Sequence, residues 1–185
     1  MSDIRVASRY AKSLIDLAQE KGIVEEVHAD MQLFSKTVKD NRDFKLFLTN
    51  PIIKHDKKLV ILQSLFQNKV QPLTQTFFSI VTQKQREAIL DSVATEFIRQ
   101  YNEMKGIEIA YITTAVPLSP ELRTQVNQRL ATITGKTIQL IEKVDLNMIG
   151  GFILRVGDKQ VDDSIRTDLR HLKQKFEENP YINKL

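Results

Sequence analysis

Few residues in this sequence have the types and the spacing that chemistry requires. Gly135-Lys136-Thr137 matches the end of a phosphate-binding P-loop, but the glycine that the motif needs five positions earlier is replaced by Leu130. A P-loop also follows a strand and opens a helix, whereas this tripeptide follows a predicted helix and opens a predicted strand. The pattern favours a glycine that ends a helix, and a phosphate-using enzyme is the weaker hypothesis.

The histidines and aspartates form no catalytic or metal-binding pattern either. His28, His55 and His171 lie outside the spacing of metal-ligand motifs, and each is expected to be a surface or hydrogen-bonded histidine. Asp162 and Asp163 are neighbours on a predicted strand, so their carboxylates point to opposite faces and form no acid–base pair. The chain has no cysteine, which excludes disulfides and thiolate metal sites. We expect no catalytic residue, no metal and no cofactor.

The glycine-rich segment 150–165 is predicted to be architectural. Gly150-Gly151 allows a sharp entry into a strand, because glycine adopts a positive φ without strain. Gly157-Asp158 predicts a tight turn to a partner strand. Asp163 or Ser164 is expected to cap the following helix, and Asp162 to face solvent. Apolar spacing predicts that this last helix buries one face, made by Ile165, Leu169, Leu172 and Phe176.

The elements that must position these residues fall into two groups, an α+β class overall. Residues 1–105 show six amphipathic helices with short connections, which predicts a six-helix bundle. At Gly106 the hydrophobic period changes from helical to alternating, and residues 106–178 read as a small α/β domain of order β-α-β-β-β-α. Its first helix is predicted to begin after a Ser119 cap, and residues 179–185 to form a flexible tail. The buried stripe predicted for that helix is Leu122, Val126, Leu130 and Ile133.

Composition and charge leave one further class open. The 185 residues are 42% hydrophobic and 27% charged, with a net charge of +4, and the pI of about 9.2 would suit a nucleic-acid-binding module. The charge is dispersed, however, and the densest basic spot, Lys54, Lys57 and Lys58, includes Asp56. A solvated surface is therefore the better explanation, with nucleic-acid binding as the alternative. No apolar run approaches the roughly 18 residues that span a bilayer.

The remaining candidate for function is a helix surface. The first helix presents Tyr10, Ala11 and Leu14, and the fifth presents Phe77 and Ile80. Small and aromatic residues side by side can form a groove that accepts an amphipathic helix. The same spacing also suits side chains that fill the core of the bundle, so both readings stay open on spacing alone.

Three segments of the chain resemble the delta subunits of ATP synthases, whose mitochondrial relative is the oligomycin-sensitivity-conferring protein. Residues 9–14 resemble the family's R-Y-A-x-A-L opening, and Asn50-Pro51 resembles its turn after the third helix. Residues 150–172 are similar to its C-terminal signature of a glycine-rich entry, an apolar strand, Gly-Asp and D-x-S-x-x-x-x-L-x-x-L. Two positions depart from the family pattern: Ser13 stands where alanine is common, and Asp163 where glycine is common.

The resemblance implies a non-catalytic subunit of the peripheral stalk of a rotary, proton-translocating ATP synthase. It implies that the helical domain binds the N-terminal helix of an alpha subunit, which favours a groove at Tyr10, Ala11, Leu14, Phe77 and Ile80. It implies that the C-terminal domain contacts the b subunits of the stalk, so that the catalytic head does not turn with the rotor. It also implies a peripheral location on the cytoplasmic face of a bacterial inner membrane, without membrane insertion or nucleic acid.

Overall fold

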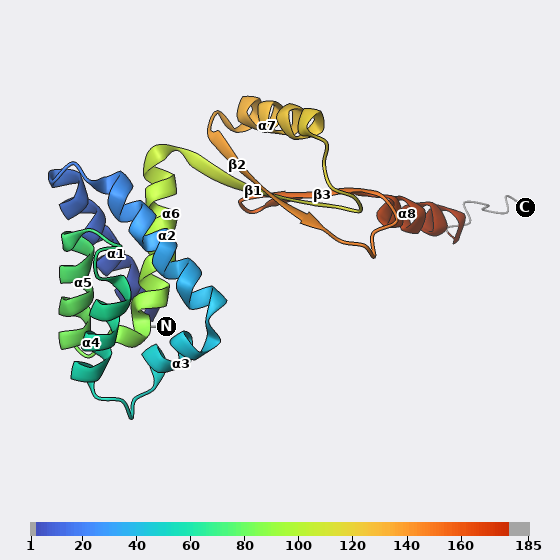
Figure 1. The fold of residues 1–185 in the computed structure, drawn as a ribbon. Helices are drawn as coiled ribbons and strands as arrows, with labels where there is room; N and C mark the ends of the chain where they lie inside the picture. The colour runs from blue at the N-terminus through green and yellow to red at the C-terminus, as the bar shows by residue number, and fades with distance from the viewer. Residues whose placement is uncertain (1–2, 178–185) are drawn as a thin grey trace, which may run out of the picture. The chain divides into compact units, whose positions relative to one another are not determined.

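The computed structural model describes residues 3–177, which divide into two compact units between Lys105 and Gly106 (Figure 1). The predicted tail, residues 179–185, lies outside the described part. The order of the elements confirms the α+β class, with helices alone in the first unit and a sheet with two helices in the second.

The first unit contains the six predicted helices. Apolar spacing predicts the sixth helix over residues 86–101, but a short 3₁₀ turn, η1, stands at the beginning of this range, and the helix itself starts at Leu90. The bounds are α1 Asp3–Glu20, α2 Val24–Asp40, α3 Arg42–Thr49, α4 His55–Phe66, α5 Pro72–Gln83, η1 Glu87–Ile89 and α6 Leu90–Lys105.

Two clusters of side chains build the core of this bundle. The α6 helix packs along α1 and α2, and the fully buried Ala7, Ala11 and Ala18 of α1 leave room for its close approach. The second cluster is aromatic: Phe34 of α2 lies 5.5 Å from the ring of Phe66 on α4 and 5.0 Å from the ring of Phe78 on α5. Such tilted aromatic pairs add to the free energy gained from burying their area.

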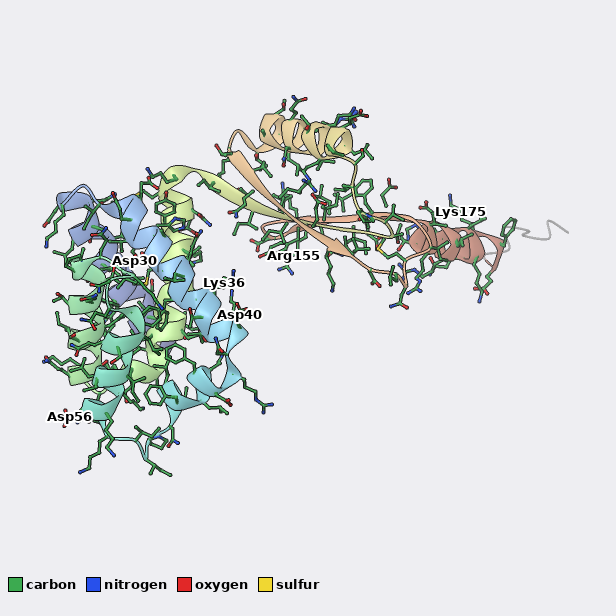
Figure 2. The ribbon with its side chains drawn as sticks, viewed as in Figure 1. Asp30, Lys36, Asp40, Asp56, Arg155 and Lys175 are labelled. Atoms are coloured by element: carbon green, nitrogen blue, oxygen red, sulfur yellow. The ribbon has the colours of Figure 1, made fainter. Side chains whose placement is uncertain are left out.

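A buried carboxylate ties α2 to the start of α5. Asp30 lies on α2 within the bundle (Figure 2) and is only 7% exposed. Its Oδ2 accepts hydrogen bonds from the backbone N–H of Gln71 at 2.8 Å and from the hydroxyl of Thr74 at 2.6 Å. Since Gln71 precedes the helix and makes no side-chain cap itself, Asp30 supplies from α2 the acceptor that the free N-terminus of α5 requires.

The second unit follows the predicted order β-α-β-β-β-α. Its four-stranded sheet has the spatial order β2-β1-β3-β4. The α7 helix makes the crossover between the parallel strands β1 and β2, while β3 is antiparallel to both β1 and β4. The bounds are β1 Ile107–Thr114, α7 Pro120–Thr134, β2 Thr137–Val144, β3 Gly151–Val156, β4 Lys159–Ser164 and α8 Ile165–Glu177.

Glycine is required at the start of the β3–β4 hairpin. Gly151 has a φ of +80°, and a Cβ atom there would collide with the carbonyl oxygen of Asp163 on the paired strand. Gly157, with a φ of +56°, and Asp158 form the two-residue turn between the strands. Gly151 and Gly157 therefore have the architectural role predicted for this segment, whereas Gly150 does not adopt the positive φ expected for the Gly150-Gly151 pair.

Candidate partner-binding surfaces

The first candidate surface joins α1 to α5. The rings of Tyr10 and Phe77 meet edge to face, with centroids 6.2 Å apart, and both side chains are half-buried. Arg86 also contacts Tyr10: its guanidinium lies 5.9 Å from the ring centroid and donates a hydrogen bond to the phenol oxygen at 3.2 Å. Arg86 was not among the predicted residues, because it lies 76 positions away from Tyr10.

The structure separates the five predicted groove residues into two sets. Ala11 and Leu14 are 0% and 1% exposed, so they pack in the core, as the alternative reading held. Ile80 is 46% exposed on α5, one helical turn from Phe77 on the same face. Tyr10, Phe77 and Ile80 are therefore the accessible members, and Ala11 and Leu14 can affect this surface only through the position of α1.

The second candidate surface is an apolar groove of about 560 Å³ between α7 and the sheet. The predicted buried stripe of α7 is only partly correct, because Leu130 is buried whereas Leu122 and Ile133 are 49% and 79% exposed. The helix itself begins and ends as predicted: Ser119 Oγ accepts from the N–H of Leu122 at 3.3 Å, and Gly135 ends it in the left-handed conformation. Residues from both sides line the groove, among them Leu122, Val126, Ile133, Phe152, Leu154 and the turn glycine Gly150.

The α8 helix presents a third apolar surface. The prediction that this helix buries one face is wrong for the chain alone, since none of its residues is buried. Periodicity shows that a helix is amphipathic but does not show what covers its apolar face. The exposed fractions are 42% for Ile165, 53% for Leu169, 50% for Leu172 and 80% for Phe176.

The start of α8 is held by Asp162 and Ser164. Asp162 Oδ1 accepts from the backbone N–H of Ser164 at 3.0 Å, and its Oδ2 accepts from the hydroxyl of Thr167 at 3.0 Å. The hydrogen bonds from Ser164 and then Thr167 lower the pKa of Asp162. Ser164 Oγ accepts weakly from the N–H of Thr167 at 3.4 Å. Of the two predicted capping residues, Ser164 therefore has the role and Asp163 does not, and Asp162, exposed as predicted, supports the cap. The D-x-S spacing was the signal for it.

One lysine of the basic spot in the sequence is buried and paired with a carboxylate. Lys58 is 2% exposed, and its ammonium donates at 2.8 Å to Glu87 Oε1 and at 2.8 Å to the carbonyl of Leu48 at the end of α3. His55 Nδ1 lies 2.9 Å from the same Glu87 oxygen. Burial favours the neutral form of Glu87, but hydrogen bonds from Lys58, its own backbone and His55 outweigh it and lower the pKa of the carboxyl. Lys58 is thus a structural cation and does not face solvent.

The chemical motifs considered in the sequence have structural roles. Gly135 is the C-cap of α7, as expected, and Lys136 Nζ pairs with Glu108 Oε2 at 2.7 Å on the neighbouring strand. Across residues 3–177, no three histidine or acidic side chains are placed to hold a metal ion. In the same range, no helix has both the length and the apolar character needed to cross a membrane.

These features define a class of protein that acts through docking: two small units, each with apolar side chains left at its surface. The chain belongs to the ATP synthase delta (OSCP) subunit family, whose profile matches residues 6–176. That match covers both units and the hairpin that connects the sheet to α8.

Individual relatives agree with the family assignment. An ATP synthase subunit delta of Cytophaga hutchinsonii is 42% identical over 178 residues, which cover 96% of this chain and 97% of that protein. One from Christiangramia forsetii is 37% identical over 185 residues and covers both chains completely. Among solved structures, a chain of the Toxoplasma gondii mitochondrial ATP synthase hexamer superposes with a TM-score of 0.70 at 26% identity, covering 94% of this chain and 98% of its own. None of these findings supports the nucleic-acid-binding alternative.

Proposed function

We propose that this protein is a non-catalytic subunit of the peripheral stalk of a rotary ATP synthase. It links the alpha/beta catalytic head to the b-subunit stalk, so that the head does not turn with the rotor. The observation that carries the proposal is the family match over residues 6–176, in a chain whose relatives of the same length are named ATP synthase subunit delta. Its place is the cytoplasmic face of a bacterial inner membrane, held there through the complex.

In this proposal the helical unit, residues 1–105, binds the N-terminal helix of an alpha subunit. The half-buried Phe77 and the half-exposed Ile80 offer apolar area on successive turns of α5. Tyr10 is held in place by contacts with both Phe77 and Arg86. A preorganised aromatic pair of this kind suits the anchor of a helix-in-groove contact, because little side-chain entropy is lost on binding.

The second unit, residues 106–178, contacts the b subunits. This part of the proposal is supported by the apolar side chains that remain exposed in the groove beside α7 and on α8. Contiguous exposed apolar surface in a folded protein generally marks an interaction site. A clamp that transmits torque needs durable contacts at both ends and no active site of its own.

The test is calorimetric titration of the full chain with a synthetic peptide of the alpha-subunit N-terminus from the same genome. We expect micromolar or tighter binding, and at least tenfold weaker binding for Tyr10→Asp, because the charge would have to be desolvated in an apolar contact. Tyr111→Asp is the matched control, since Tyr111 is a 49% exposed tyrosine of the other unit. If the unaltered chain does not bind the peptide, or if the two variants lose equal amounts of affinity, the proposed surface is contradicted.

A second measurement addresses the proposed function as a whole. The tagged full chain, added to solubilised membranes, is expected to recover alpha and b subunits together. Recovery of neither subunit would refute the assignment to the peripheral stalk.

A further inference from the structure

The groove beside α7 and the exposed face of α8 form one continuous surface. Gly150 lines the groove, and the Cδ1 atom of Ile165, the first residue of α8, lies 2.7 Å from the point that a Cβ on Gly150 would occupy. The apolar stripe of α8 therefore starts at the rim of the groove. We call this surface the apolar track; it consists of the groove residues Leu122, Val126, Ile133, Phe152 and Leu154 and the α8 residues Ile165, Leu169, Leu172 and Phe176.

The flanks of the track on α8 are basic. At 100° per residue, the positions beside the stripe are Arg166 and Lys173 on one side and Asp168 and Lys175 on the other. Three of these four side chains are cationic, and Lys175 extends from α8 in Figure 2. Lys173 Nζ lies 3.6 Å from Glu177 Oε1, an exposed pair that a partner carboxylate can replace at little cost. Arg129 of α7 adds a further cation at the groove.

We propose that the apolar track binds an acidic amphipathic helix. Its apolar stripe would cover α8 and enter the groove, and its flanking carboxylates would face Arg129, Arg166 and the two lysines. A partner helix of at least about 13 residues, or roughly 20 Å, is needed to cover the stripe of α8 alone. The inference deepens the proposed stalk contact and rests on it for the identity of the partner, but the chemistry of the partner follows from the track itself.

The charges argue against a second copy of this chain as the occupant. Each copy would contribute Arg166, Lys173 and Lys175 but only Asp168 to the flanks, so two α8 stripes packed face to face would carry an excess of positive charge, which opposes association. An acidic partner converts the same side chains into ion pairs at the rim. Such pairs set specificity and association rate more than total affinity, while the apolar stripe supplies most of the affinity.

The experiment uses the full chain and two synthetic amphipathic helices with the same leucine stripe, one flanked by glutamates and the other by lysines. Fluorescence anisotropy at low salt is expected to show at least tenfold tighter binding of the glutamate peptide. The preference should shrink as salt is raised, because the rim pairs are exposed and screened. In Arg166→Glu/Lys173→Glu the preference is expected to reverse in favour of the lysine peptide.

The matched control is Arg155→Glu/Lys143→Glu. These two exposed side chains lie on the opposite face of the sheet, since Arg155 alternates with the groove residue Leu154 and Lys143 is in register with Thr113. The control is expected to keep the preference for the glutamate peptide. Equal binding of both peptides, or an equal change in the two double variants, would overturn the inference.

Two further outcomes separate the inference from the proposed function. Recovery of the b subunit with no response to Arg166→Glu/Lys173→Glu would overturn the inference and leave the stalk assignment standing. A reversed peptide preference in a chain that recovers no synthase subunit would support the inference and refute the assignment. Concentration-dependent dimerisation that Leu172→Asp abolishes would assign the track to a second copy and overturn the inference.

Discussion

Replacing Lys58 with methionine is expected to destabilise the helical unit strongly. The change keeps most of the aliphatic volume but removes the ammonium that donates to Glu87 and to the carbonyl of Leu48, both at 2.8 Å. Glu87 is 4% exposed, and the loss of its buried partner leaves a carboxylate without adequate compensation. Removing one member of a buried ion pair typically costs about 3–5 kcal/mol.

The lower end of that range is expected here because His55 Nδ1 remains 2.9 Å from the same carboxylate oxygen. A loss of about 3 kcal/mol in the free energy of unfolding corresponds to a decrease in melting temperature of at least about 12 °C for a unit of this size. Urea unfolding, followed by far-ultraviolet circular dichroism, measures the loss in the free energy of unfolding. Lys57→Met is the matched control, since Lys57 is an exposed lysine on the same helix and should change stability by less than about 0.5 kcal/mol.

The effect of pH tests the cause of that destabilisation. In the unaltered chain the pKa of Glu87 is lowered from its ordinary 4.5. The ionised carboxylate therefore adds to the free energy of unfolding above pH 4.5, and this stabilisation is lost as the pH falls through the pKa of Glu87 in the folded state. Replacing Lys58 removes the largest of the interactions that lower the pKa of this carboxyl, while the burial that favours its neutral form remains. The free energy of unfolding that Lys58→Met loses relative to the unaltered chain should then be smaller at pH 4 than at pH 7. An equal deficit at both pH values, or a deficit no larger than that of Lys57→Met, would refute the reasoning.

Three other outcomes follow from contacts described above. Thr74→Val should lower the free energy of unfolding by about 2 kcal/mol in chemical denaturation, because it removes a charge-assisted hydrogen bond to the buried Asp30. Gly151→Ala should disrupt the hairpin, which is visible as lost or shifted amide signals in NMR spectra. Gly135→Ala places no atom within 4 Å of the new Cβ, so it should lower the free energy of unfolding by only about 1 kcal/mol, through its left-handed φ. Burial lowers the pKa of His28 from 6.5, so the unfolded chain binds more protons and stability should decrease as the pH falls below about 6.5. Replacing His28 with phenylalanine should flatten that slope in urea titrations.

Local patterns predicted the elements well because each is specified by neighbouring residues. Pro120 after a capping serine starts α7, and a left-handed Gly135 ends it, as the sequence indicated. Gly151 was predicted to allow a turn, and the close carbonyl of Asp163 shows why no other residue fits. The 3₁₀ turn before α6 was missed, because the apolar spacing of residues 86–101 does not distinguish the first turn of a helix from a tighter one.

Long-range partners were not predictable in the same way. Lys58 looked like a member of a basic spot, and only the fold brings it to Glu87, 29 positions away. Arg86 and Tyr10 are likewise joined by the packing of the bundle and by no local pattern. For the candidate groove, spacing grouped Ala11 and Leu14 with the accessible Tyr10, but the packing of α1 within the bundle buries both side chains.

The two units differ in how far their own side chains complete a core, and this difference separates their proposed roles. The helical unit buries residues from every α-helix and satisfies buried charges at Asp30 and Lys58 with internal partners. Within residues 106–177, the buried apolar side chains are Ala110, Ile112 and Leu130, while the stripes of α7 and α8 remain largely exposed. Apolar burial is the main favourable contribution to folding, so a partner that covers the apolar track would stabilise the second unit as it binds. A helical unit with a complete core can present a small, rigid site, whereas we expect the second unit to gain stability from the helix that we propose it binds.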